Sequence, residues 1–198
     1  ILILIVIGIV THIQWFDNLS LLVYGDCFID YPERLVEFFT FPQAWITNGL
    51  GGVNIGAVFW PLLYLTGALS YLGLSTGLIE RILYLFPIAL LTPIAMYALA
   101  YYILKSRVGA FSSAIVYAFN IPLIVMSTGI ITSHMAISIA PLFFLTFILA
   151  INRARFFYAY LSCFLIFIIG TYDFRYAYLN LLVCGIYVLY QLKFLSNP

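Results

Sequence analysis

Long apolar runs joined by short polar connections make up most of this chain. Six runs are long and apolar enough to be interpreted as membrane-crossing helices, at about 1–16, 78–104, 108–128, 131–151, 156–170 and 176–192. A helix needs about 20 apolar residues to cross a hydrocarbon core of about 30 Å. Lipid offers no hydrogen-bond partners, so a crossing segment must satisfy its backbone within a helix. The pattern therefore predicts an all-α, polytopic membrane protein.

The composition excludes a water-soluble domain. Hydrophobic residues make up 65% of the 198 residues and charged residues only 8%, and the mean hydropathy is +1.13. The chain starts within an apolar run, ILILIVIG, and ends on LSNP soon after the last run. We therefore expect a single transmembrane domain over 1–198 that is a fragment of a larger protein. Only Cys27 lies outside the apolar runs, so no disulfide framework is indicated.

The basic residues predict how the chain is oriented. Every second connection is basic: Lys105 and Arg107, then Arg153 and Arg155, then Lys193 after the last run. Cytoplasmic loops carry an excess of Lys and Arg, so this alternation places the amino end in the cytoplasm. All 7 acidic residues then fall on the other side. We expect a multi-pass protein of the cell membrane whose active face is extracytoplasmic, with residues 17–77 as an outer loop.

The apolar segment 56–73 lies within this outer loop. If it crossed the membrane, every later basic connection would move to the outer side, so the charge pattern argues against crossing. Pro61 and Gly67 also interrupt it. A re-entrant or interface-lying helix fits better, with Trp60 and Tyr71 at the depth of the lipid headgroups.

A short amphipathic helix is expected at residues 31–40, YPERLVEFFT. Leu35, Phe38 and Phe39 share one face at helical spacing, and charged residues occupy the other. Asp30 stands where it can cap this helix at its amino end.

Asp26 is the residue best suited to acid–base chemistry. It follows Gly25 soon after the first run ends, among aromatic neighbours that include Tyr24. A carboxylate at a membrane boundary is partly desolvated, which raises its pKa and makes it a usable proton acceptor. A solvated aspartate that forms a turn is the plainer interpretation and stays open. For Asp30, helix capping is a sufficient explanation.

The second candidate is Arg175, which forms a short outer turn with Asp173 in the sequence GTYDFRYAY. A guanidinium group at this depth suits a lipid phosphate, because it can donate two parallel hydrogen bonds. A local pair with Asp173, or snorkelling toward the headgroups, explains the residue equally well. Arg81 is expected to be an interface anchor, and His134 a hydrogen-bonded structural residue.

Several kinds of site have no signature in the sequence. The two histidines, His12 and His134, are isolated, and no spacing of His, Cys and acidic residues indicates zinc. There is no phosphate-binding glycine loop, no nucleophile elbow and no basic patch for nucleic acid. These observations exclude a nucleic-acid partner and leave the outer loop as the candidate working region.

The order of motifs resembles the GT-C superfamily of polytopic glycosyltransferases, in its arabinofuranosyltransferase-like branch. The motifs that carry the resemblance are GDCFID at 25–30, the Trp60-Pro61 segment, LGL at 72–74, Glu80-Arg81 at a span entry, and GAFSSAIVYAFNIPLIV at 109–125. The resemblance covers most of the chain and would make it the amino-terminal part of such an enzyme. Family members usually have more spans and often a soluble outer domain, and neither is present in this sequence.

The resemblance implies sugar transfer at the outer face. Such enzymes take a sugar from a polyprenyl-phosphate donor and pass it to an envelope glycan or protein acceptor. An acidic residue of the first outer loop acts as base or, in some branches, holds a divalent metal. Asp26 would then be catalytic and Asp30 the second acid.

The donor pocket follows from the same interpretation. Arg175 would bind the donor phosphate, and Tyr24, Tyr172 and Asp173 would line the pocket with it. Two other classes stay open, a transporter or flippase and a non-catalytic assembly subunit. The only candidate for a helix broken within the membrane, as transporters use, is Asn120-Ile121-Pro122.

Overall fold

The computed structural model describes residues 1–17, 32–41, 43, 45–46, 52–53 and 59–194. Within these ranges the regular secondary structure is helical apart from one antiparallel ladder of two two-residue strands, β1 (Trp45–Ile46) and β2 (Gly52–Val53). The predicted all-α class is confirmed.

The longest helices form the centre of the molecule. The segments α4 (Thr76–Glu80), a π-helical turn (Arg81–Leu85) and α5 (Phe86–Leu104) run on as one helix of 29 residues. It packs against α8 (Ile131–Arg153), and both are long and apolar enough to cross a membrane. The structure thus supports a membrane protein.

A bent pair of helices is a third candidate for a membrane span. The helices α6 (Arg107–Ala118) and α7 (Ile121–Gly129) pass the same test together and meet at 47°. The bend falls at Asn120, whose side-chain Oδ1 accepts from the backbone N–H of Leu123 at 3.0 Å and so starts α7. Pro122 has no N–H to donate to the preceding turn. The break predicted at residues 120–122 is confirmed.

Four further helices complete the bundle at positions close to those predicted. They are α1 (Leu2–Thr11), α2 (Gln14–Asp17), α9 (Phe156–Tyr172) and α10 (Phe174–Phe194). The predicted run 1–16 is split between α1 and α2, and α1 extends only about 15 Å at about 1.5 Å per residue. Among the described residues, two helices, or three with the bent pair, meet the length and composition of a span. The number of six crossings therefore stays a prediction.

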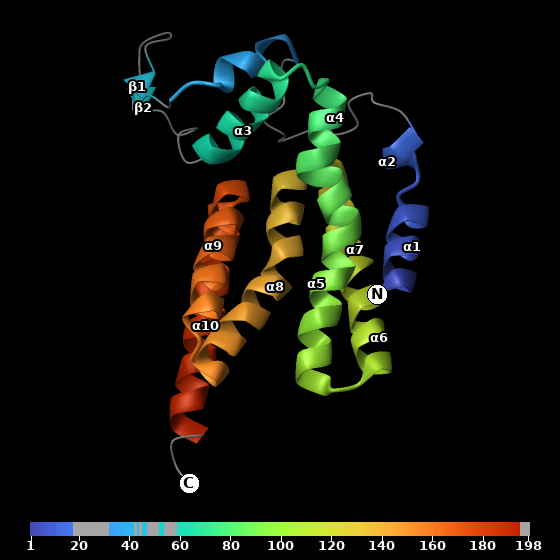
Figure 1. Cartoon of the computed structure of the whole chain (residues 1–198), viewed down its shortest axis with the longest axis vertical. Helices are drawn as coiled ribbons and strands as arrows, with labels where there is room; N and C mark the ends of the chain where they lie inside the picture. The colour runs from blue at the N-terminus through green and yellow to red at the C-terminus, as the bar shows by residue number, and fades with distance from the viewer. Residues whose placement is uncertain (18–31, 42, 44, 47–51, 54–58, 195–198) are drawn as a thin grey trace.

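The outer-loop helices lie across one end of the bundle (Figure 1). They are a 3₁₀ helix (Pro32–Phe38) and α3 (Trp60–Tyr71), which pack on each other. Contact is close at Gly67, where an added Cβ would collide with the backbone of Phe38 and Phe39. Leu35 is buried, while Phe38 is half-buried and Phe39 stacks on Tyr71. A 3₁₀ helix thus occupies part of the predicted range 31–40, and Leu35 and Phe38 are turned inward, but Phe39 lies beyond its end and is exposed. The helix α3 does not run along the bundle as a further span.

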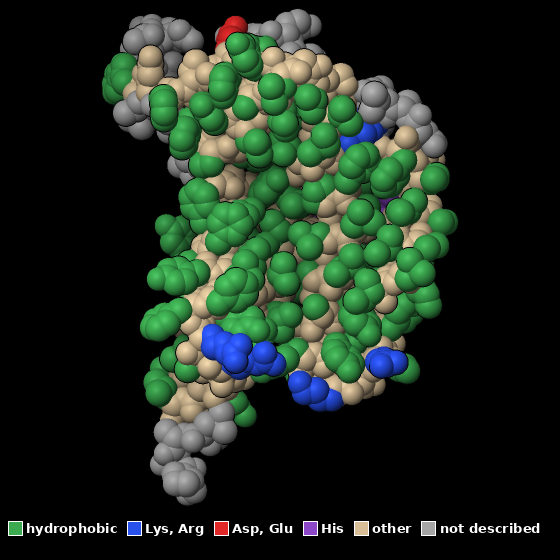
Figure 2. Space-filling view, in the orientation of Figure 1, with side chains coloured by type: hydrophobic (Ala, Val, Ile, Leu, Met, Phe, Trp, Pro, Cys, Tyr) green, Lys and Arg blue, Asp and Glu red, His purple; other side chains and the backbone are tan. Residues whose placement is uncertain are grey.

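Basic side chains gather at the opposite end of the molecule (Figure 2). That end holds the connection from α5 to α6, with Lys105 and Arg107, and the connection from α8 to α9, with Arg153 and Arg155. Both connections begin with a residue in the left-handed backbone conformation, Lys105 (φ 53°) and Ala154 (φ 48°). Hydrophobic side chains cover the surface between the two ends (Figure 2).

The expectation for Arg81 as an interface anchor is wrong. Arg81 is 1% exposed, and Glu80 beside it is fully buried. The guanidinium donates from Nε to the carbonyl of Trp15 and from Nη1 to the carbonyl of Gly77, both at 2.7 Å. These bonds and the carboxylate of Glu80, 3.7 Å from Nη1, offset part of the hydration that the guanidinium loses on burial. Arg81 therefore connects α2 to the central helix.

Candidate functional site

The sharp junction between α9 and α10 holds an arginine in a fixed position. Asp173 has extended backbone there, and its Oδ1 accepts from the N–H of Arg175 at 3.0 Å, which caps the start of α10. The same carboxylate accepts from Arg175 Nε at 3.0 Å and from Nη2 at 2.7 Å. Asp173 is 3% exposed, whereas the Arg175 side chain is 65% exposed. The buried acid thus orients an accessible cation.

A serine from a neighbouring helix completes this arrangement. Ser133 on α8 donates to Asp173 Oδ2 at 2.5 Å, and Arg175 Nη2 lies 3.4 Å from the Ser133 hydroxyl. The sequence interpretation did not assign Ser133 to the site. An available signal was the α8–α9 hairpin, because antiparallel helices bring residues at similar distances from the turn side by side.

The environment of Asp173 favours its ionised form. Burial is the largest single influence and opposes ionisation, but the hydrogen bonds from Arg175 and Ser133 together outweigh it. The pKa of the Asp173 carboxyl consequently lies below its usual range. The carboxylate stays charged at neutral pH and keeps Arg175 in place.

Arg175 and Asp173 line a pocket of about 250 Å³. The other lining residues come from the junction, from the start of α8 and from the residue before α3: Phe59, Ile130, Thr132, Tyr172 and Phe174. Phe59 brings the outer loop to the pocket, a contact that the sequence did not reveal. The first turn of α10 also lies here, and a helix amino end favours anions. The pocket therefore combines a cation with an apolar wall.

Tyr172 lines the pocket as predicted, but its hydroxyl is engaged elsewhere. It donates to the carbonyl of Leu83 at 2.7 Å, within the π-helical turn. The ring meets Tyr84 edge-on, with centroids 5.6 Å apart. Tyr172 contributes an apolar ring to the pocket and connects α9 to the central helix.

The other predicted site residues, Tyr24, Asp26 and Asp30, lie outside the described residues. Their approach to Arg175 therefore stays a prediction. Within the described part of the chain, no group of three His, Cys, Asp or Glu side chains could hold a metal ion.

His134 follows Ser133 on α8 and is also buried, but its side chain contacts α7 and not the Asp173–Arg175 pair. Its Nδ1 is 2.9 Å from the hydroxyl of Ser127 on α7. Among the described residues its Nε2 has no hydrogen-bond partner. The expectation of a hydrogen-bonded structural histidine is confirmed at one of the two ring nitrogens.

No protein-family model, curated protein or solved structure matches this chain.

Proposed function

We propose that the chain is part of a membrane glycosyltransferase of the GT-C type, and that Arg175 binds the phosphate of a polyprenyl-phosphate sugar. One observation carries the proposal: an accessible guanidinium held by a buried carboxylate in a pocket at the end of the bundle opposite the basic connections. Arginine binds phosphate through parallel N–H donors, and fixing its direction in advance lowers the cost of binding.

The surroundings of the pocket fit a lipid-linked donor. The walls supplied by Phe59, Ile130 and Phe174 are apolar. Exposed apolar side chains continue along α10 from the pocket, among them Tyr178, Leu182 and Leu189. A polyprenyl chain would lie against this surface while its phosphate reaches Arg175. In this proposal the pocket end is extracytoplasmic, the amino end is cytoplasmic, and the chain crosses the cell membrane several times.

The proposed reaction uses a base and a cation. An acceptor hydroxyl of a glycan or protein attacks the anomeric carbon, and Asp26 takes its proton as the new glycosidic bond forms. The bond from the anomeric carbon to the phosphate oxygen breaks, and Arg175 stabilises the departing polyprenyl phosphate. In this proposal Asp30 would be the second acid, and Tyr24 would line the pocket. Alternatively, Asp26 and Asp30 would hold a divalent metal ion.

The experiment measures sugar transfer from a polyprenyl-phosphate donor by the full-length enzyme in lipid. Asp26→Asn should abolish transfer while leaving donor binding largely intact, because only the base is lost. Arg175→Ala should instead weaken donor binding. Unchanged transfer by the Asp26→Asn protein would exclude this mechanism.

A transporter or flippase is the second candidate, and the bent pair α6–α7 is the observation that favours it. Transporters commonly use helices broken at membrane depth. A transport reaction would depend on Asn120, whose side chain forms the bend. If Asn120→Ala stopped lipid or solute movement in vesicles while Arg175→Ala did not, the transporter would be favoured.

A further inference from the structure

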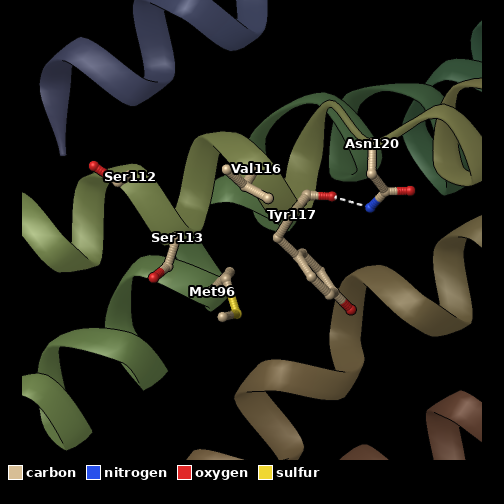
Figure 3. Close-up of a pocket in the computed structure, with 6 residues that line it drawn as sticks. All are labelled: Met96, Ser112, Ser113, Val116, Tyr117 and Asn120. Carbon is tan, nitrogen blue, oxygen red and sulfur yellow. Dashed lines mark hydrogen bonds between the residues drawn. The ribbon is translucent and has the colours of Figure 1, made fainter.

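A second cavity lies between α5 and α6, far from Arg175 in the sequence. It measures about 450 Å³ and is lined by Met96, Ser112, Ser113, Val116, Tyr117 and Asn120 (Figure 3). Cavities of roughly 300–1,000 Å³ are typical of small-molecule sites. Four of the lining residues, at positions 113, 116, 117 and 120, are separated by helical spacing and therefore form one continuous stripe on α6 and the bend that follows it. The cavity is a groove along the α5–α6 pair.

The groove lies within the apolar length of the bundle. At about 1.5 Å per residue, it begins about 8 Å along the chain of α6 from Arg107, at Ser112, and reaches about 20 Å at Asn120. Val116 on its edge is 71% exposed on an apolar helix, so the groove faces the space that lipid fills. The hydroxyl of Tyr117 and the side-chain amide of Asn120 are hydrogen-bonded within the protein, so the groove presents mainly apolar surface. A hydrocarbon chain suits such a surface.

The end of the groove nearest the α5–α6 connection is positively charged. Lys105 and Arg107 are both exposed there, and neither has a carboxylate partner among the described residues. The sequence has no acidic residue between Glu80 and Asp173. Lys105 Nζ stands 4.2 Å from the centre of the Tyr102 ring, which holds one cation beside the helix end. The two basic residues suit the phosphate of an anionic phospholipid, and the groove suits one of its acyl chains.

We propose that the α5–α6 hairpin binds one anionic phospholipid, with its phosphate at Lys105 and Arg107 and one acyl chain in the groove. This site is separate from the Arg175 pocket and does not rest on the glycosyltransferase proposal. Each basic residue near the surface contributes roughly a fivefold preference for anionic lipid. The groove adds a fixed place for the chain, which distinguishes this lipid from the bulk bilayer.

The test uses the full chain in nanodiscs with a phosphatidylglycerol whose acyl chain carries a photoreactive diazirine. Labelling should concentrate on the peptides of α5 and α6 that contain Met96 and Val116. Ser113→Phe should reduce that labelling on the order of tenfold by filling the groove. Val116→Trp fills the groove from its exposed edge and should act in the same way. Cys163→Phe on the exposed face of α9 is the matched control and should leave it unchanged.

The headgroup is tested separately. Phosphatidylcholine with the same chains should label these peptides less, and Lys105→Gln with Arg107→Gln should remove the difference between the two lipids. Glycerol phosphate, which has the headgroup chemistry without chains, should not compete. The proposal would be overturned if labelling were spread over all helices in proportion to exposure, or if it survived in both groove-filling variants. Equal labelling by the two lipids, or competition by glycerol phosphate, would also overturn it.

Discussion

Asp173 is the residue on which the candidate site depends most. It caps α10, accepts from Ser133 and holds Arg175, so one buried carboxylate joins three parts of the molecule. Charge-assisted hydrogen bonds of this kind contribute about 1.5–3 kcal/mol each when buried. Arg175 is 65% exposed, so its pair with Asp173 contributes less. Most of the stabilisation therefore comes from the buried bonds of Asp173 to Ser133 and to the start of α10.

Asp173→Asn should lower the free energy of unfolding by about 1–2 kcal/mol, because the amide keeps the shape but loses the charge. The effect should depend on pH. The pKa of Asp173 is depressed in the fold, so its contribution is complete above the usual aspartate pKa of about 3.9 and is lost as pH falls through the folded value.

The measurement is unfolding in mixed detergent, followed by circular dichroism, for the wild type and Asp173→Asn. Their difference should be constant from pH 5 to 7, in keeping with an ordinary pKa near 3.9, and should shrink below about pH 4. A difference that grows on acidification would mean that Asp173 is not held ionised.

At this scale the sequence predicted single residues better than their partners. The pair of Asp173 with Arg175 was an open alternative because both stand in one short turn. The partners of Arg81 were not predictable, since one is the backbone carbonyl of Trp15, 66 residues away. Charged residues at the end of an apolar run are ordinarily assigned to the surface, whereas tertiary packing buries this one.

Among the elements, the seating of α3 on the 3₁₀ helix determines where the outer loop lies over the bundle. Gly67→Ala should weaken that contact, because the new methyl group would collide with backbone at Phe38 and Phe39. The expected cost is about 1–3 kcal/mol, as for overpacking in cores.

Gly185→Ala is the matched control, since an added Cβ there meets nothing within 4 Å. Both substitutions gain the same helix propensity, of about 1 kcal/mol, so the difference between them isolates the steric effect. Thermal unfolding of the two variants in the same detergent measures it. Equal melting temperatures would contradict the close packing of α3.

Helix positions followed from the sequence to within a few residues, and their tertiary uses did not. The apolar runs end at polar connections, so the ends of α5, α8 and α9 could be predicted from the sequence. Asn120 and Pro122 indicated the position of the bend. The split of the first run at His12 was missed, because hydropathy is insensitive to a local turn inside an apolar segment. The pocket was missed in part because Phe59, the residue before α3, is more than 70 residues from the other lining residues in the sequence.

Charge separation along the bundle is the property of the whole molecule that predicts its orientation. In a protein without native cysteines, Ser106→Cys and Ala154→Cys should be protected from a membrane-impermeant maleimide in sealed vesicles oriented as in the cell. Leu72→Cys, which is exposed at the end of α3, should react. The reason is the positive-inside bias of the two connections. Labelling at Ser106 from outside would reverse the proposed orientation.

Equilibrium binding of a polyprenyl-phosphate sugar to the chain in nanodiscs tests the central claim most directly. Arg175→Ala should weaken binding on the order of 10–100-fold, the equivalent of one lost charged hydrogen-bonding partner. Arg155→Ala removes an exposed arginine at the other end of the bundle and should leave affinity unchanged. Equal affinity of the wild type and the Arg175→Ala protein would contradict the account.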